Sequence, residues 1–425
     1  MNRLRILIAS VLCVTACTIS ANEYTAIYAG KLIDVEASKE LSNQAILIKG
    51  EQIVALGDRR KINIPDDARI LDLGAYTVLP GLIDAHAHIN QSWQDHGYAV
   101  FTRSEGGDAI QGVINASTML QQGFTSARVP GTLSFADVAL RDAINAGKVP
   151  GPRLKVAGPY VGVTGGCNDE NVKLSALFRV EMSGRVNGVD EARRVVREHA
   201  LRKVDQIKTC TTGSVLSMSG GLNETQWSMD ELEALVDEAH RHNMPVLAHA
   251  HGTAGIKKAI LAGVDSIEHA SVLDNETIRL AIKHGTALVM DIYWTDWIQA
   301  EGLKNGMAAE SLQRDRDIGQ TQRDGFRKAH KAGANIVFGT DVGGFPFTEN
   351  SKQFATMVEY GMSEMAVLRS ATIKAAALMR MDAMTGSLKV GKYADIVAVR
   401  NNPLDDISEL ERVQFVMKNG EIVRQ

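Results

Sequence analysis

Two histidines near residue 87 have the spacing of a metal site. His86 and His88 stand two positions apart at the end of the apolar run Leu82-Ile83-Asp84-Ala85. Side chains at positions i and i+2 of a β-strand share one face, so both imidazoles can reach the same divalent cation. The alternative is that the two histidines only line a hydrated loop, so a metal site needs support from other residues.

Three other side chains of metal-binding type end segments that read as strands. They are His249, His269 and Asp341, which close the runs Val246-Leu247-Ala248-His249, Ser266-Ile267-Glu268-His269 and Phe338-Gly339-Thr340-Asp341. If these strands run parallel in one barrel, their carboxyl ends converge on one mouth. Imidazoles and a carboxylate would then surround a common point, which predicts a metal centre.

Lys208 ends another such run, Val204-Asp205-Gln206-Ile207-Lys208. An ammonium group aimed at divalent cations is repelled unless its chemistry changes. If burial and nearby cations favour the neutral amine, it can take up carbon dioxide and become a carbamate, an anionic bridge between metals. The alternative is an ion pair with Asp205 or Glu224.

The middle of the chain alternates short β-rich runs with amphipathic helical stretches. The expected strands lie near Val78–His86, Phe124–Val129, Leu154–Val161, Val204–Cys210, Pro245–His249, Ser266–His269, Ala287–Trp294 and Asn335–Thr340. The expected helices include Asp190–Arg202, Ser228–His242, Thr253–Leu261, Asn275–His284 and Ala308–Lys331. Eight strands interleaved with helices favour an α/β fold with a (β/α)8 TIM barrel over residues 77–385.

Both ends of the chain read as β structure. Residues 22–76 carry short apolar runs between turn residues, and residues 386–425 repeat that texture around the hairpin signal Asn419-Gly420. Neither half has enough strands for a stable sheet. We therefore expect the two termini to form one small β-sandwich domain.

Composition excludes several classes of protein. The chain has 425 residues, a formal net charge of −4, 23% charged residues and 45% hydrophobic residues, which is typical of a globular protein and not of a basic nucleic-acid binder. Four cysteines in this length exclude a disulfide scaffold. Cys167 and Cys210 fall near the predicted mouth, and an oxidising compartment would let them pair if geometry allowed. We expect two free buried thiols.

Residues 1–21 read as an export signal. A short basic start, Met1–Arg5, precedes an apolar run too brief to span a bilayer, and small residues at Ser20-Ala21 offer a cleavage site. The alternatives are a lipoprotein signal with Cys17 as the lipidated residue and an uncleaved anchor. We expect a periplasmic or secreted protein with no integral membrane span after signal removal, because no later run approaches about 18 apolar residues.

The ordered set of these motifs resembles the metal-dependent amidohydrolase superfamily. The likeness is carried by Gly81–His88, Lys208, His249, His269, Gly339–Asp341 and Gly391–Val397. It implies a barrel with a terminal β-sandwich and a centre of two divalent ions, Zn²⁺ by preference. Its implied ligands are His86, His88 and Asp341 on one metal, His249 and His269 on the other, and carboxylated Lys208 between them.

Within the superfamily the chain resembles a branch of dipeptidases and carboxypeptidases, including prolidase-like and zinc-dependent arginine carboxypeptidase-like enzymes. Asp291–Asp296, Gly158–Tyr160 with Thr164–Gly166, and Lys352–Ala355 carry that narrower likeness. It implies hydrolysis of a small peptide or N-acyl amino acid that releases a C-terminal Arg, Lys or Pro. Cys167 and Phe347 stand where the branch has histidine or polar residues, which puts the substrate side chain in doubt. We also expect a homo-oligomer.

The implied chemistry assigns roles to four residues. A bridging water between two dications has a pKa near neutrality, and Asp341 could take its proton and pass it to the leaving amine. His251, two residues after His249, is the candidate for stabilising the oxyanion, with substrate positioning or loop structure as the alternative. Arg128 could pair with a substrate carboxylate, or form a salt bridge inside the barrel. Tyr293 is a further candidate substrate contact.

Other functions remain open at this point. A deaminase on this scaffold would carry a glutamate where Gly252 stands, and an imidazolone-type hydrolase would need no bridging lysine. Hydrolysis of another amide, such as an aryl amino-acid conjugate, fits the same residues. A non-catalytic binding module would have lost metal ligands that are present here.

Overall fold

The computed structural model describes residues 24–95, 99–167, 169–178, 182–216 and 220–425. The expected export signal, with Cys17 as its alternative lipidation site, lies outside these residues. Among the described residues no helix combines the length and apolarity needed to cross a membrane.

The central part of the chain alternates strands and helices, as expected. Its strands are β5 (Leu82–Asp84), β6 (Phe124–Arg128), β7 (Arg153–Lys155), β8 (Gly162–Val163), β9 (Arg185–Val186), β10 (Ile207–Cys210), β11 (Val246–Ala250), β12 (Ser266–His269), β13 (Ala287–Val289) and β14 (Ile336–Val337). Its helices are α1 (Ala99–Thr102), α2 (Glu105–Gln121), α3 (Ala136–Asn145), α4 (Val189–Leu201), α5 (Met229–Arg241), α6 (Thr253–Leu261), α7 (Asn275–His284), α8 (Trp294–Trp297), α9 (Ala309–Lys331), α10 (Lys352–Glu359), α11 (Glu364–Arg369) and α12 (Ala375–Leu378). The expected strand Ala287–Trp294 is too long, because the chain turns after β13 and Trp294 begins α8.

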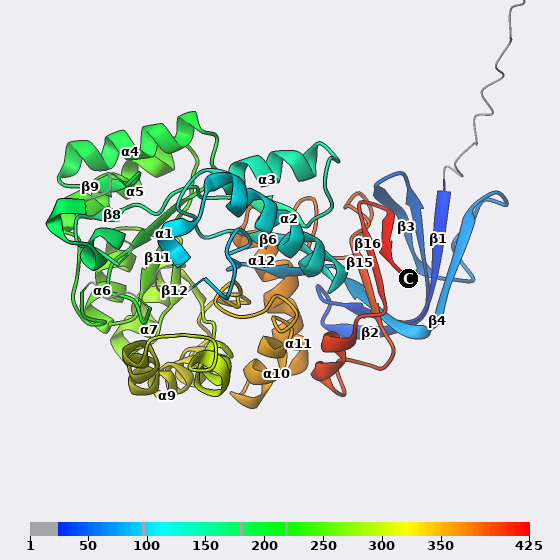
Figure 1. The fold of residues 1–425 in the computed structure, drawn as a ribbon. Coiled ribbons are helices and arrows are strands. Elements are labelled where there is room, and N and C mark those ends of the chain that lie inside the picture. The colour runs from blue at the N-terminus through cyan, green and yellow to red at the C-terminus, as the bar shows by residue number, and fades with distance from the viewer. Residues whose placement is uncertain (1–23, 96–98, 168, 179–181, 217–219) are drawn as a thin grey trace, which may run out of the picture.

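The strands of this body form two larger parallel sheets. One has the order β5-β6-β7 and the other β10-β11-β12-β13-β14, and helices surround them (Figure 1). Backbone hydrogen bonds link segments that belong to or follow the strands of the two sheets. Val161 N donates to Lys208 O at 2.8 Å, and Ala85 N donates to Phe338 O at 3.0 Å. Neighbouring strands that run parallel end on the same side, so the side chains at their carboxyl ends are brought together.

Close packing at the ends of β5 and β14 depends on glycine. A Cβ atom on Gly339 would lie 3.0 Å from His86 Cβ and closer still to Val289. The Asp84 carboxylate ties the same two strand ends, because it accepts from His86 N and from both the backbone N and the hydroxyl of Thr340. Burial raises the pKa of Asp84 to about 7. The hydrogen bonds to Asp84 therefore fix the positions of His86 and Asp341 relative to each other.

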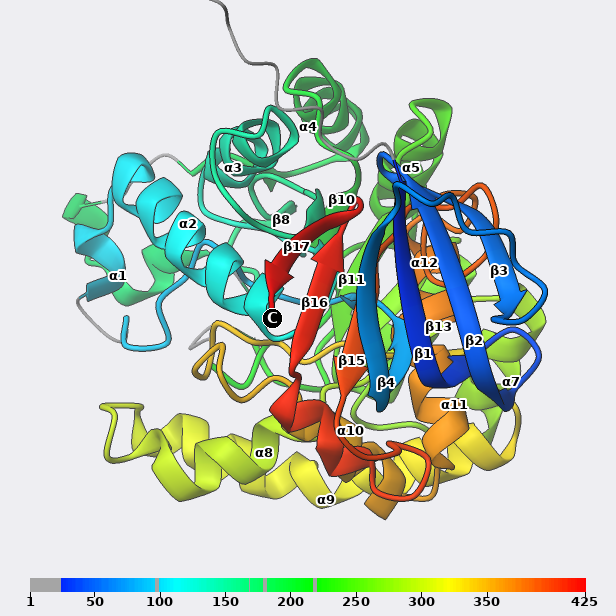
Figure 2. The same cartoon turned by 90° about the vertical axis from the view of Figure 1, so that its right-hand side faces the viewer.

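Strands from both ends of the chain pair with one another, as expected, but they form a single sheet. β1 (Tyr24–Asp34), β2 (Lys39–Lys49), β3 (Gln52–Asp58) and β4 (Arg69–Pro80) join β15 (Ile396–Val399), β16 (Phe415–Lys418) and β17 (Glu421–Arg424) in the order β17-β16-β15-β4-β1-β2-β3. Figure 2 shows the first and last segments side by side in this sheet. The expected two-sheet sandwich is therefore corrected to one continuous seven-stranded sheet.

A bend explains how one sheet can enclose a core. The register of β1 against β4 shifts between Ala29 and Lys31, where Gly30 packs against the carbonyl of Gly74 with no room for a side chain. A bulge of this kind bends the long strands, and apolar residues of β1, β2, β4, β15 and β16 pack together in one buried cluster. Alternate residues of β15, such as Val397, pack instead on the core of the central body.

One helical histidine is buried although it stands among charged residues in the sequence. This residue is His199 on α4. It is buried, since it shares the inward face of α4 with Val195, one turn earlier. Its Nε2 lies 2.9 Å from Pro159 O.

Candidate metal centre

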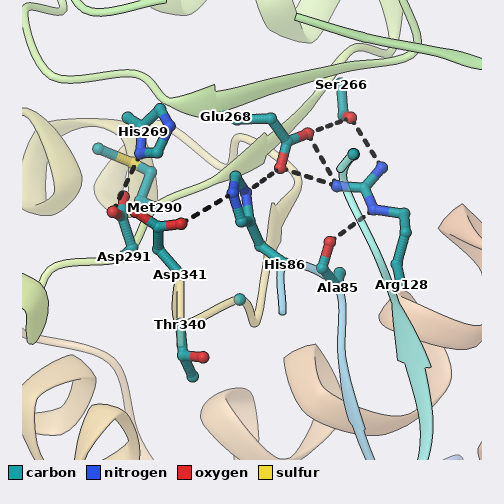
Figure 3. Close-up of polar contacts among 12 residues, drawn as sticks. Ala85, His86, Arg128, Ser266, Glu268, His269, Met290, Asp291, Thr340 and Asp341 are labelled. Atoms are coloured by element: carbon teal, nitrogen blue, oxygen red, sulfur yellow. Dashed lines mark hydrogen bonds and ion pairs between the residues drawn. The ribbon is translucent and has the colours of Figure 1, made fainter. Parts of the chain in front are cut away.

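Three residues from three different strand ends converge on one point. His86 follows β5, His269 ends β12 and Asp341 follows β14, and one nitrogen or oxygen atom of each lies within 4.8 Å of the others. His86 Nε2 lies 3.2 Å from Asp341 Oδ1. All three side chains point toward the same space in Figure 3. Two imidazoles and a carboxylate are suitable ligands for zinc, manganese or cobalt.

The backbone at two of these residues is strained. His269 has φ +69° and Asp341 has φ +60°, the left-handed region that residues other than glycine rarely adopt. Such strain concentrates at functional sites, where surrounding structure holds the residue in place. The left-handed turn lets each strand end aim its last side chain inward.

His86 is held by a buried carboxylate that the sequence interpretation missed. Glu268 is 0% exposed, and its Oε2 lies 2.6 Å from His86 Nδ1. Arg128 donates to both oxygens of Glu268, at 2.8 and 2.9 Å, and Ser266 donates to Oε1 (Figure 3). A carboxylate on Nδ1 leaves Nε2 of His86 free to bind a cation. The sequence did offer one indication of this contact. Ser266 and Glu268 are two positions apart on β12, so their side chains share one face of the strand.

His269 has the same kind of support. Its Nδ1 lies 3.0 Å from Asp291 Oδ2, and Gln322 donates to the other oxygen of Asp291 at 3.2 Å. Asp291 is therefore committed to orienting His269. Asp296, five residues further along the chain, forms an ion pair with Arg323.

His88 joins the cluster through Asp341. His88 Nε2 lies 3.2 Å from Asp341 Oδ1, the same oxygen that faces His86. Although burial raises it, the neighbouring His86 and His88 hold the pKa of Asp341 well below its usual range. Asp341 is therefore an ionised carboxylate, the form that binds metals.

His249 on β11 and His251, which follows that strand, bring two more imidazoles to the cluster. The ring centroid of His249 lies 4.5 Å from that of His269 and 4.6 Å from that of His251. Burial, helped by the neighbouring His269, lowers the pKa of His249 and of His251 well below the usual range. Both are neutral imidazoles near pH 7, as metal ligation or hydrogen-bond donation to an oxyanion requires.

Lys208 is buried without a hydrogen-bond partner. The residue is 3% exposed, and Nζ has no partner among the described residues. Burial lowers the pKa of Lys208 to about 8, although the carboxylates of Glu268 and Asp341 oppose that shift. The two alternative partners are engaged elsewhere, since Asp205 accepts from Arg141 and Glu224 from Gly221 N.

The donor set fits divalent cations. An unpartnered buried amine beside ionised Asp341 and neutral imidazoles is unfavourable for the protein alone, because buried polar groups need partners. His86 Nε2 is likewise buried without a well-aligned hydrogen bond. The structure thus brings together the predicted ligands His86, His88, His269 and Asp341, places His249 beside His269, and puts Lys208 within electrostatic range of them.

Two predicted substrate contacts have other partners. Arg128 donates to Ala85 O and Ser266 as well as to Glu268, and it is buried. It forms the internal salt bridge that was its alternative interpretation, so its donors are not available to a substrate carboxylate. Tyr293 donates its hydroxyl to Glu349 at 2.7 Å and packs on Phe345, in the loop that follows Asp341.

The expectation of two free thiols is wrong. Cys167 and Cys210 form a disulfide with a Cα–Cα distance of 6.2 Å. The two cysteines are 43 positions apart in sequence, so only the packing of the loop after β8 against β10 brings them together. The bond joins that loop to the strand that carries Lys208.

Comparison with known proteins identifies the family. The profile of the amidohydrolase family matches residues 77–423, so the chain belongs to that family. The ochratoxinase of Aspergillus niger is 31% identical over 435 aligned residues, which cover 94% of this chain and 86% of that protein.

Solved structures agree with this assignment. A Xaa-Pro dipeptidase with methionine bound in its active site superposes with a TM-score of 0.90 at 36% identity, over 95% of this chain and 100% of that one. A prolidase complexed with N-methylphosphonate-L-proline gives a TM-score of 0.88 at 31% identity, over the same shares. The protein is therefore a hydrolase that acts on carbon–nitrogen bonds, and its family generally binds divalent metals.

Proposed function

We propose that the protein is a metal-dependent dipeptidase or carboxypeptidase that releases the C-terminal amino acid of a small peptide or N-acyl amino acid. The observation that carries the proposal is Lys208, whose buried amine lacks a partner beside the imidazole and carboxylate cluster. The Xaa-Pro dipeptidase and the prolidase complex among its structural neighbours support the substrate class.

The proposed ligands divide between two divalent ions. His86, His88 and Asp341 would hold one, His249 and His269 the other, and Lys208 would bridge them as a carbamate, formed when its neutral amine adds to carbon dioxide and releases a proton to solvent. Zinc suits these nitrogen and oxygen donors. When bound, such ions lower the pKa of water towards neutrality and polarise a carbonyl group.

In this proposal Asp341 transfers a proton and His251 donates a hydrogen bond. Asp341 is ionised and can accept the proton of the attacking water, then return it to the leaving amine. Ser271 lies 2.8 Å from His251 Nδ1. With the Ser271 hydroxyl donating to Nδ1, the proton of neutral His251 stands on Nε2 and can be donated to the developing oxyanion. Tyr293 is kept as a substrate contact on the loop side of the site.

We also propose that the site lies in a closed barrel and that the protein is exported. The two parallel sheets would close into a (β/α)8 barrel through the backbone bonds between Val161 and Lys208 and between Ala85 and Phe338. The Cys167–Cys210 disulfide supports export to an oxidising compartment such as the periplasm.

A second candidate substrate is an aryl amino-acid amide. The Aspergillus niger relative is named an ochratoxinase. In this chain, aromatic rings from separate segments pack near the loop that follows Asp341, with Phe345 5.5 Å from Tyr293 and Trp297 5.8 Å from Trp93 between ring centroids. These rings would favour an apolar or aromatic acyl group.

A substrate library tests both candidates. The zinc-loaded enzyme is assayed with dipeptides that vary the C-terminal residue, and with N-aryl-acyl amino acids. Release of the C-terminal amino acid from dipeptides supports the first proposal, and preference for aryl amides supports the second. Absence of amino-acid release from every member, in protein that carries two zinc ions per chain, contradicts both.

A further inference from the structure

A tyrosine connects two of the proposed metal ligands. The hydroxyl of Tyr160 lies 3.1 Å from His88 Nδ1, the imidazole nitrogen opposite the one that faces Asp341. The next residue, Val161, donates its backbone N–H to the carbonyl of Lys208 at 2.8 Å. The adjacent residues Tyr160 and Val161 therefore contact two proposed ligands, His88 after β5 and Lys208 on β10.

Glycines form a close-fitting socket around Tyr160. A Cβ on Gly131, where φ is +129°, would lie 2.5 Å from the Tyr160 ring. A Cβ on Gly184, where φ is +88°, would collide with the Tyr160 carbonyl. The segment is also tied to its neighbour by Thr132 N, which donates to Gly158 O at 2.9 Å. Gly131 thus packs against the ring of Tyr160, while Gly184 packs against its backbone.

Two oxygen atoms near His88 Nδ1 can accept a hydrogen bond from it. To offer the lone pair of Nε2 to a cation, His88 must carry its proton on Nδ1, which then needs an acceptor. Gly131 O, at 3.3 Å, can only accept, and the Tyr160 oxygen at 3.1 Å is closer. Gln91 donates its amide to the Tyr160 oxygen at 2.9 Å. A phenol oxygen has two lone pairs, so it can accept from Gln91 and from His88 together.

We propose that Tyr160 is a positioning residue that holds His88 in its metal-binding tautomer and keeps the Gln91 amide from donating to the imidazole. This inference rests on the proposed role of His88 as a metal ligand. Gln91 Nε2 lies 3.4 Å from His88 Nδ1. Without the phenol oxygen, His88 Nδ1 remains as an acceptor within reach of this amide. A bond from Gln91 to Nδ1 moves the imidazole proton to Nε2 and blocks the lone pair that faces Asp341.

The test compares metal binding of three variants. Tyr160→Phe removes only the hydroxyl and leaves the ring in its socket. Tyr160→Phe with Gln91→Leu also removes the competing amide. Tyr360→Phe is the control, because it removes the hydroxyl of a different tyrosine, the buried residue that follows α10. Zn²⁺ affinity is measured by competition with a chromophoric chelator, the visible spectrum of the Co²⁺-loaded protein reports ligand geometry, and the thermal midpoint of the metal-free protein reports folding.

The expected result is a 10- to 100-fold weaker Zn²⁺ affinity in Tyr160→Phe, with an altered Co²⁺ spectrum and an unchanged metal-free thermal midpoint. The added Gln91→Leu change should recover part of the affinity, and Tyr360→Phe should match the wild type. Wild-type affinity and spectrum in Tyr160→Phe overturn the inference, as does a change confined to the thermal midpoint. Failure of the wild-type protein itself to bind two ions refutes the proposed function instead.

Discussion

The buried carboxylate behind His86 gives the sharpest prediction. Glu268 is fully buried, and it accepts two hydrogen bonds from Arg128 and one from Ser266, and contacts His86 Nδ1. Glu268→Gln keeps the shape but removes the charge, which leaves the Arg128 guanidinium buried without its counter-ion. Removing one partner of a buried ion pair lowers the free energy of unfolding by about 3–5 kcal/mol. We expect the lower end, about 3 kcal/mol, because the amide oxygen can still accept from Arg128.

A double variant separates stability from metal binding. Replacing both partners, as in Arg128→Met with Glu268→Leu, removes the unpaired charge and should restore most of the stability. It still deprives His86 Nδ1 of its carboxylate, so Zn²⁺ affinity should stay about 10- to 100-fold below wild type.

Urea denaturation of the metal-free proteins and chelator competition measure the two effects. A Glu268→Gln protein within about 1 kcal/mol of the wild type would refute the reasoning, because the ion pair would then contribute far less than buried pairs do. Wild-type Zn²⁺ affinity in the double variant would show that Glu268 does not prepare His86 for a cation.

Three further changes have defined outcomes. Asp341→Asn should lower kcat by a factor of about 100 or more while zinc analysis of the purified protein still finds bound metal, and near-wild-type kcat would remove Asp341 from proton transfer. Lys208→Ala should lose at least one ion per chain, with part of the turnover restored by a short-chain carboxylate, and an unchanged metal content would exclude a bridging role. Glu238→Gln should lower the free energy of unfolding by about 1–2 kcal/mol at pH 7, because hydrogen bonds from Arg197 and Arg193 lower the pKa of Glu238 to about 2. Since this pKa lies below the usual 4.5, the difference between wild type and variant should shrink as the pH falls from 4.5 towards 2, and a difference independent of pH would contradict the ion-pair explanation.

Residues at strand ends could be predicted from sequence because their pattern is local. A short apolar run that ends in histidine or aspartate predicts both a strand and a side chain at its carboxyl end. That reasoning placed His86, His269 and Asp341 at one point, and the structure brings them together. The helix Asn275–His284 was also predicted with its observed ends, since Asp274 caps it and Gly285 ends it in a left-handed conformation.

Contacts between distant segments could not be predicted in this way. The role of Glu268 depends on Arg128, 140 positions away, and on His86, 182 positions away, and no local pattern links them. The Cys167–Cys210 bond likewise depends on how one loop folds over β10. The single terminal sheet could not be predicted either, because it depends on the pairing of β15 with β4, which come from opposite ends of the chain.

The most direct test of the account is a crystal structure of the zinc-loaded protein with anomalous scattering measured at the zinc edge. Two zinc peaks per chain are expected, at bonding distances of about 2.0–2.2 Å from nitrogen and oxygen atoms of the proposed ligands. Density for a carbamate on Lys208 is expected between the two peaks. A single peak, or a Lys208 side chain directed away from His249 and His269, would contradict the central claim that these residues together hold a pair of cations.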